Sequence, residues 1–215
     1  MGKETIKYIL FDAANTLIHK PQLWTKMDAA FQKFGIEVDM KRLQTNHKLL
    51  SEVIEFPDKT SADFYRKFNA DLLLSLGIIP EEELLNCIFE YCTYLPWEKF
   101  EDTNVLDKLN VPVGVVSNFN NGLSGILNGL FGNRFQDIIV SEEKKLRKPD
   151  LAFYQLAQDA VGLKPDEILY IGDSLSLDII PGKQMGWRVL LIDRLELFTA
   201  GGLSISSLNA LSEIV

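Results

Sequence analysis

The chain has 215 residues, of which 47% are hydrophobic and 24% charged, as expected for a globular protein with one sizeable core and a small additional domain. Its formal net charge is −8, and the run at residues 142–148 is basic only locally because it contains two acids of its own. A broad nucleic-acid surface needs a basic stripe, so we expect no nucleic-acid partner.

The cysteines and the hydrophobic runs indicate the cellular compartment in which we expect the protein. Cys87 and Cys92 lie five positions apart in one predicted helix, so they do not share a face, and we expect free thiols rather than a disulfide or a zinc site. The N-terminal apolar stretch is too short for a signal peptide. The most apolar internal run, residues 72–79, is far shorter than the roughly 20 residues that span a bilayer. These features favour a soluble cytoplasmic protein without membrane contact.

The first predicted element is a buried strand at residues 6–11, where the apolar run is continuous. Residues 18–100 contain no convincing strand. Apolar residues there recur at helical spacing, which predicts helices at residues 23–34, 40–54, 61–76 and 81–94. Pro80, followed by three glutamates, is typical of a helix start, and Gly35 and Gly77 are placed where helices should stop.

The rest of the chain alternates between strands and helices. Further strands are predicted at residues 111–116, 137–140, 168–171 and 188–192, and helices at residues 122–130, 150–161 and 175–185. This alternation is typical of an α/β domain with an open, mostly parallel sheet and helices on both sides. The helical block of residues 18–100 interrupts that domain after its first strand.

Polar residues follow three of the predicted strands. Asp12 follows the first, Ser117 and Asn118 follow the second, and Asp173 follows the strand at residues 168–171. Because sites in parallel sheets form at the carboxyl ends of strands, we expect these side chains to converge. Two carboxylates brought together are costly without a cation, and magnesium suits such a site. Lys148 could add a further positive charge.

These segments resemble the four motifs of the haloacid dehalogenase-like (HAD) hydrolase superfamily, in order and in approximate spacing. The matching segments are Phe11-Asp12-Ala13-Ala14-Asn15-Thr16-Leu17, Val116-Ser117-Asn118, Lys148-Pro149-Asp150 with Phe153, and Gly172-Asp173-Ser174-Leu175-Ser176-Leu177-Asp178. The resemblance implies a three-layer Rossmann-like parallel sheet core at residues 1–17 and 101–215. It also implies that residues 18–100 form an inserted α-helical cap domain of the small subfamily I type.

The resemblance implies a nucleophile and a metal site. Asp12 would attack phosphorus and form an aspartyl-phosphate, which splits one difficult step into two. Asp12 and Asp173 would bind magnesium together with the backbone carbonyl of Ala14. We therefore expect a magnesium-dependent hydrolase of the phosphatase type that acts on a small phosphorylated metabolite.

The same resemblance implies roles for the neighbouring residues. Ser117 and Lys148 would be catalytic with the nucleophile, and Asn118 would join them in binding the substrate. Asp178 would orient the metal shell or the lysine from behind. Thr16 would pack and hydrogen-bond near the nucleophile loop, although an ordinary turn threonine explains it equally well.

One residue departs from the family pattern. Family phosphatases carry a second aspartate two positions after the nucleophile, which protonates the leaving oxygen and then activates water, and here that position is Ala14. Loss of such help typically costs about 10²–10⁴-fold in rate. Either the substrate has an activated leaving group, such as an acyl phosphate, or a residue such as His19, His47 or Lys48 replaces the acid, or the protein is a catalytically weak ligand-binding or regulatory protein.

Two family branches also lack that second acid. The 2-haloacid dehalogenases usually lose the Gly-Asp of the fourth motif, which is present here as Gly172-Asp173, and their cap arginine pattern is not visible. Phosphonoacetaldehyde hydrolases have alanine at this position and use a lysine of the cap. Lys48 could correspond to that lysine, but no surrounding motif supports the match. Specificity would come from cap loops, such as residues 55–59. The sequence does not indicate the oligomeric state.

Overall fold

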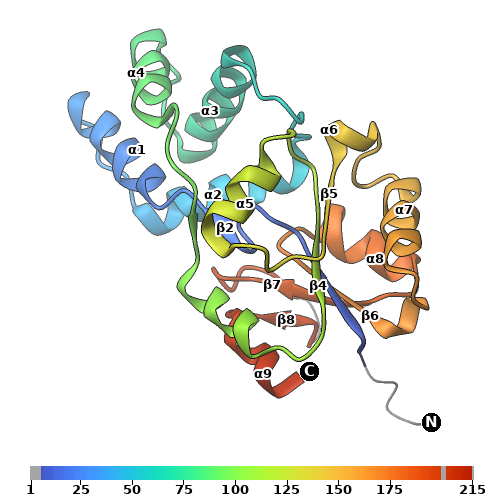
Figure 1. Cartoon of the computed structure of the whole chain (residues 1–215). Helices are drawn as coiled ribbons and strands as arrows, with labels where there is room; N and C mark the ends of the chain where they lie inside the picture. Colours follow the sequence, from blue (N-terminus) through green and yellow to red (C-terminus); the bar gives the residue numbers. More distant parts are fainter. Residues whose placement is uncertain (1–5, 200–201, 215) are drawn as a thin grey trace. The chain divides into compact units, whose positions relative to one another are not determined.

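The computed structural model describes residues 6–199 and 202–214, and the chain divides into two compact units. The core unit comprises Met1–His19 and Glu98–Val215, and the helical unit comprises Lys20–Trp97 (Figure 1). The helical unit therefore interrupts the core unit in the sequence.

The core unit is built on a parallel sheet of six strands in the order β5-β4-β1-β6-β7-β8. Its strands are β1 (Tyr8–Phe11), β4 (Val113–Ser117), β5 (Asp137–Val140), β6 (Ile168–Gly172), β7 (Arg188–Ile192) and β8 (Ser204–Ile205). Strands β1, β4 and β6 are buried along their whole length, because helices cover both faces of the sheet. The predicted α/β fold class with a Rossmann-like parallel sheet is confirmed.

Short and medium helices connect these strands. The α-helices are α5 (Leu123–Phe131), α6 (Ser141–Lys144), α7 (Leu151–Val161), α8 (Ile180–Gln184) and α9 (Leu211–Ile214). The predicted helix at residues 175–185 is instead a π-helical turn, η3 (Leu175–Ile179), followed by α8. The described residues of this unit also form the 3₁₀ segments η1 (Glu101–Lys108), η2 (Pro165–Glu167) and η4 (Leu208–Ala210). Figure 1 shows α7 and α8 on the side of the sheet opposite α5.

A group of aromatic residues lies in the core between the sheet and α7. The rings of Tyr154, Tyr170 and Trp187 contact one another edge to face, with centroids 5.6–6.2 Å apart. Trp187 donates its indole N–H to Gln158 at 2.9 Å, so the polar end of this ring is paired as well. This packing fixes α7 and the segment that precedes strand β7 against strand β6.

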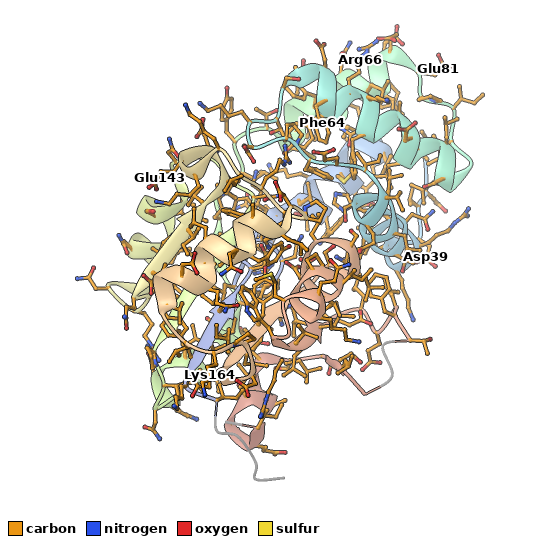
Figure 2. The ribbon with its side chains drawn as sticks, turned by 90° about the vertical axis from the view of Figure 1, so that its right-hand side faces the viewer. Asp39, Phe64, Arg66, Glu81, Glu143 and Lys164 are labelled. Carbon is orange, nitrogen blue, oxygen red and sulfur yellow. The ribbon has the colours of Figure 1, made fainter. Side chains whose placement is uncertain are left out.

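The helical unit contains α1 (Gln22–Lys33), α2 (Met40–Val53), α3 (Ala62–Leu76) and α4 (Glu82–Cys92). Asp39 caps α2 by accepting from the amides of Lys41 and Arg42, and α3 ends at Gly77, whose φ of +80° favours glycine. Figure 2 shows Asp39 at the start of α2. No helix in the described part of the chain is long and apolar enough to cross a membrane.

The expectation that residues 18–100 contain no strand was wrong at both ends. β2 (Ile18–His19) and β3 (Glu98–Lys99) form a two-stranded antiparallel sheet in the core unit. Strands of two residues give too little apolar alternation to be read from sequence. They tie together the chain segments that leave and re-enter the core unit.

Candidate functional site

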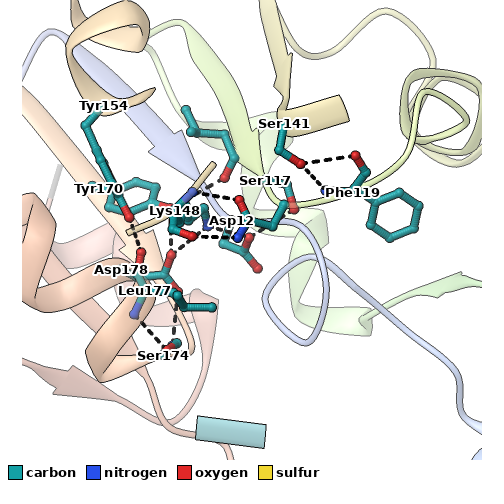
Figure 3. Close-up of polar contacts among 12 residues, drawn as sticks. Asp12, Ser117, Phe119, Ser141, Lys148, Tyr154, Tyr170, Ser174, Leu177 and Asp178 are labelled. Carbon is teal, nitrogen blue, oxygen red and sulfur yellow. Dashed lines mark hydrogen bonds and ion pairs between the residues drawn. The ribbon is translucent and has the colours of Figure 1, made fainter. Parts of the chain in front are cut away.

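The site is centred on Asp12, which follows β1 and is 7% exposed. One of its carboxylate oxygens, Oδ1, accepts from Ser117 Oγ at 3.1 Å and from Lys148 Nζ at 2.7 Å (Figure 3). The amide of Asp12 donates to Ile171 on strand β6. Neighbouring parallel strands end at the same sheet edge, and this brings together Asp12 and Ser117, which are 105 positions apart.

Lys148 is a buried cation that is held both at its ammonium group and at its backbone. Its Nζ lies 2.7 Å from Asp12 Oδ1 and 2.7 Å from Asp178 Oδ1, and its side chain is 2% exposed. Its backbone forms a double hydrogen bond with the amide side chain of Asn118, at 2.8 and 3.0 Å. Asn118 thus holds the lysine backbone, which was not part of the substrate-binding role expected for it.

Asp178 is fixed by three donors. Besides Lys148, it accepts from the hydroxyl of Tyr170 at 2.7 Å and from the amide of Ser174 at 3.0 Å (Figure 3). The same tyrosine ring lies under the lysine, with Nζ 5.4 Å from its centroid. Sequence reasoning missed Tyr170, although a tyrosine inside a buried strand needs a hydrogen-bond partner, and that need was the available signal.

Glycine is required at position 172 for this arrangement. A Cβ atom built on Gly172 would lie far inside van der Waals contact with the carboxyl carbon of Asp178. The missing side chain lets the carboxylate sit directly against strand β6. The Gly-Asp pair of the fourth motif therefore has a steric reason as well as a chemical one.

Three carboxylates gather at this edge of the sheet. Asp12, Asp173 and Asp178 each offer an oxygen within 4.8 Å of the others. Together with Lys148 they carry a formal charge of −2 (three carboxylates and one ammonium) in a largely buried region. Uncompensated charge in such a place is costly, and carboxylate oxygens suit magnesium, so the donor set fits a divalent cation.

The electrostatics of Asp12 agree with this charge excess. Burial raises the pKa of its carboxyl group to about 6, Lys148 opposes the rise, and the neighbouring Asp178 and Asp173 add to it. The attraction to both carboxylates outweighs burial at Lys148 and raises the pKa of its ammonium group. The lysine is therefore charged near neutral pH, and additional positive charge would favour ionised Asp12.

The loop at residues 12–17, expected from the sequence to carry the nucleophile, is closed by backbone hydrogen bonds within itself and to Ile18. The amide of Leu17 donates to Ala13 at 2.9 Å and that of Asn15 donates to Ile18 at 2.7 Å. Thr16 is fully buried, yet its hydroxyl has no hydrogen-bond partner among the described residues, contrary to the hydrogen bond expected from it. The Thr16 carbonyl instead accepts from Arg194 at 2.9 Å, a contact that the sequence interpretation did not include.

The residues considered as replacements for the missing acid have packing contacts of their own. His19 stacks on Phe100, with ring centroids 3.9 Å apart, and burial lowers the pKa of its imidazole. Lys48 lies 3.7 Å from Glu52, one turn further along α2. These contacts explain the two side chains without a catalytic role.

His47 belongs to an aromatic cluster in the helical unit. Its ring meets Trp24 and Phe68 edge-on, with centroids about 5 Å away, and burial lowers the pKa of the imidazole to about 4. A histidine with that pKa is neutral at pH 7 and makes a poor proton donor to a substrate at that pH.

The helical unit also contains a cavity of about 340 Å³. It is lined by Ile54, Glu55, Phe64, Lys67, Phe68 and Asp71. Phe64 lies on α3 (Figure 2). Phe56, from the loop predicted to influence specificity, packs edge-on against it. The loop at residues 55–59 is thus anchored to α3 by an aromatic side chain.

Comparison with known proteins assigns the family. The family profile described as haloacid dehalogenase-like hydrolase matches residues 6–186, which include all four motifs. The chain belongs to this family and is a hydrolase.

Two curated relatives illustrate the range of similarity. Haloacid dehalogenase-like hydrolase domain-containing protein 3 of Danio rerio is 32% identical over 114 residues, which cover 51% of this chain and 47% of that protein. A glyceraldehyde 3-phosphate phosphatase of Methanopyrus kandleri is 24% identical over 202 residues, which cover 88% of this chain and 84% of that protein. The chain therefore aligns with about half of the first relative and most of the second.

Solved structures of the same fold are similar over nearly the whole chain. The putative HAD-hydrolase YfnB from Bacillus subtilis, bound to magnesium, has a TM-score of 0.66 with 19% identity, covering 98% of each chain. The L-2-haloacid dehalogenase RSc1362 has a TM-score of 0.69 with 18% identity, covering 98% of this chain and 99% of that one. At these identities the similarity establishes the fold alone.

Proposed function

We propose that the protein is a magnesium-dependent phosphatase-type hydrolase of a small phosphorylated metabolite, with Asp12 as nucleophile. The observation that carries this proposal is the buried Lys148, whose ammonium lies 2.7 Å from both Asp12 and Asp178 beside a third carboxylate. Such a cluster holds a nucleophile and a positive charge where an anionic substrate must approach. The phosphatase named among the relatives supports the same reaction class.

Each residue has a defined task in this reaction. A carboxylate oxygen of Asp12 forms a bond to phosphorus while the bond from phosphorus to the leaving oxygen breaks, and water then hydrolyses the aspartyl-phosphate. Lys148 offsets the repulsion between the anionic nucleophile and the anionic substrate. Ser117, whose hydroxyl lies 3.1 Å from Asp12 Oδ1, would donate to a phosphoryl oxygen.

Asp12, Asp173 and the carbonyl of Ala14 would hold the magnesium ion, and Asp178 would keep Lys148 in place from behind. When bound, magnesium would supply charge neutralisation of the transferring phosphoryl group. Alanine retains the backbone carbonyl, so the substitution at position 14 does not remove a metal ligand. What it removes is the proton that family phosphatases give to the leaving oxygen.

The missing acid points to substrates whose leaving group needs no proton. An acyl phosphate releases a carboxylate, a weak base, whereas an alkyl phosphate ester releases an alkoxide, a strong base. We therefore propose activated phosphates such as acyl phosphates as the preferred substrate class. General acid help contributes about 10²–10⁴-fold where it is needed, which is the expected gap between the two substrate classes.

A substrate panel tests this proposal. Purified protein with magnesium is given acetyl phosphate, alkyl and aryl phosphate esters, and 2-chloropropionate, and phosphate or chloride release is measured. We expect turnover of acetyl phosphate that Asp12→Asn abolishes. Equal activity of the two proteins would contradict the nucleophile assignment, and chloride release without phosphate release would favour a dehalogenase.

A second candidate function is supported by Ala14 itself: a ligand-binding or regulatory protein with little turnover. The substitution Ala14→Asp separates the two candidates. If the absent acid is the only defect, Ala14→Asp increases hydrolysis of alkyl phosphate esters by about 10²–10⁴-fold. If neither protein turns over any phosphate but both bind phosphate with magnesium, the binding function is the better account.

A further inference from the structure

Arg194 follows strand β7 and contacts the backbone of the nucleophile loop. Its Nη2 donates to the carbonyl of Thr16 at 2.9 Å, and its Nε donates to that of Asn15 at 3.4 Å. These carbonyls lie three and four positions after Asp12. A single guanidinium therefore holds the far side of the loop that carries the nucleophile.

The guanidinium is itself held in place. Asp102 forms a two-pronged ion pair with it, with nitrogen–oxygen distances of 2.7 and 3.1 Å, and Phe100 packs against its face at 3.7 Å. Asp102 also accepts from Ser207 Oγ at 3.0 Å and from the amide of Leu208 at 2.9 Å. A planar fork with this many partners has a fixed orientation, which an ammonium on a flexible chain would not reproduce.

Residues 14–16 of the loop make no side-chain hydrogen bond within the described part of the chain. Asn15 is in the left-handed region, with φ of +61°, a conformation that most residues avoid. The buried hydroxyl of Thr16 has no hydrogen-bond partner among the described residues, and Ala14 has no polar side chain. The hydrogen bonds from Arg194 to the loop carbonyls therefore hold a segment that has no side-chain hydrogen bonds of its own within the described residues.

We propose that Arg194, oriented by Asp102, is a positioning residue that fixes the nucleophile loop in the conformation that presents the Asp12 carboxylate and the Ala14 carbonyl to a divalent cation. The proposal deepens the function given above and rests on it for the cation. It concerns the loop and its affinity for magnesium, so it does not depend on which phosphate is the substrate.

The variant Arg194→Lys tests the proposal because it keeps the positive charge but lacks the planar fork. Arg188→Lys is the matched control: it makes the same substitution on an exposed side chain at the start of β7, the strand that Arg194 follows. Asp102→Asn is a second variant that keeps Arg194 and removes the charge that orients it. Thermal unfolding in EDTA reports whether each variant is folded.

Two readouts are measured on the folded proteins. Hydrogen–deuterium exchange of a peptide covering residues 12–18 should be faster in Arg194→Lys and Asp102→Asn than in the control, while exchange in strands β4 and β6 stays the same. Calorimetric titration should show magnesium binding about 10–100-fold weaker in both variants, the usual loss when an outer partner of a metal site is removed. A merely structural role would increase exchange throughout the core unit.

The proposal is overturned if exchange of residues 12–18 equals that of the control, or if it rises equally in the strands. It is also overturned if magnesium binds both variants as tightly as it binds the control. Wild-type protein that takes up no magnesium would contradict the proposed function, and loop exchange alone would then decide the role of Arg194.

Discussion

Lys148 lies between two carboxylates with almost no access to solvent. Removing one partner of a buried ion pair usually costs about 3–5 kcal/mol, because the remaining charges lose their compensation. We therefore expect Lys148→Met to lower the free energy of unfolding by roughly that amount in EDTA, measured by urea denaturation. Saturating magnesium should recover part of the loss, since the cation would compensate the same carboxylates.

Asn118→Ala serves as a comparison for this prediction, because it removes the hydrogen bonds to the backbone of Lys148 and leaves all charges in place. It should cost less than Lys148→Met and should show no special response to magnesium. A Lys148→Met protein as stable as wild type in EDTA would contradict the electrostatic account of the site.

Gly172 is the last residue of strand β6, and the π-helical turn that carries Asp178 begins three residues later. A Cβ atom here collides with the Asp178 carboxyl group, so Gly172→Ala should move that carboxylate away from Lys148 and weaken magnesium binding. Overpacking of this kind also costs about 1–3 kcal/mol of stability. Calorimetric titration with magnesium, together with urea unfolding, measures both effects.

Gly182→Ala is the matched control for Gly172→Ala. It also overpacks, because a Cβ atom at Gly182 would come within 2.7 Å of Val189 Cγ1 on strand β7. Its distance to Tyr170 Cδ1 would be 3.4 Å, an ordinary van der Waals contact, and it would not touch the carboxylates themselves. It should lose stability without losing magnesium affinity. Equal magnesium affinity in the two variants would mean that the position of Asp178 does not matter for the site.

Helix α2 places His47 against the rings of Trp24 and Phe68, and this predicts how the free energy of unfolding depends on pH. The folded-state pKa of about 4 lies below the usual 6.5, so the unfolded chain binds the proton more tightly. The free energy of unfolding therefore does not depend on His47 titration above about pH 6.5. As the pH falls from there towards about 4, protonation of His47 in the unfolded chain lowers the free energy of unfolding by no more than about 3 kcal/mol. Replacement by phenylalanine should remove this pH dependence.

Nuclear magnetic resonance measures the pKa directly, because the chain has only two histidines. His47 should titrate near pH 4, and His19 should titrate below its ordinary value. The His47→Phe spectrum assigns the two signals. Titration of His47 near 6.5 would show that its ring is more exposed to water than the contacts with Trp24 and Phe68 allow.

At the scale of the whole molecule, the sequence was a good guide to the sheet. The strands at residues 137–140 and 188–192 were predicted with the bounds that β5 and β7 have, because in each a charged residue is followed by an uninterrupted run of aliphatic residues. The two-residue strands β2, β3 and β8 were not predicted. They depend on partners distant in sequence rather than on their own pattern.

The candidate site was predictable to a lesser degree. Strand ends pointed to Asp12, Ser117 and Asp173, because the end of a strand is visible in the sequence. The hydrogen bond from Tyr170 and the backbone contacts of Arg194 join residues through tertiary packing, so the sequence can indicate that these side chains need partners but not which partners they have. Arg194 does follow a predicted strand, and extending the strand-end rule to basic residues would have singled it out.

The central claim is that Asp12 is phosphorylated in the reaction. The most direct test mixes the protein with acetyl phosphate and magnesium, stops the reaction with acid and locates the phosphoryl group by peptide mass spectrometry. We predict phosphorylation on Asp12 that accumulates, because Ala14 cannot activate the attacking water, and that disappears sooner in Ala14→Asp. Turnover without any phosphorylated Asp12, or equal turnover by Asp12→Asn, would contradict the account.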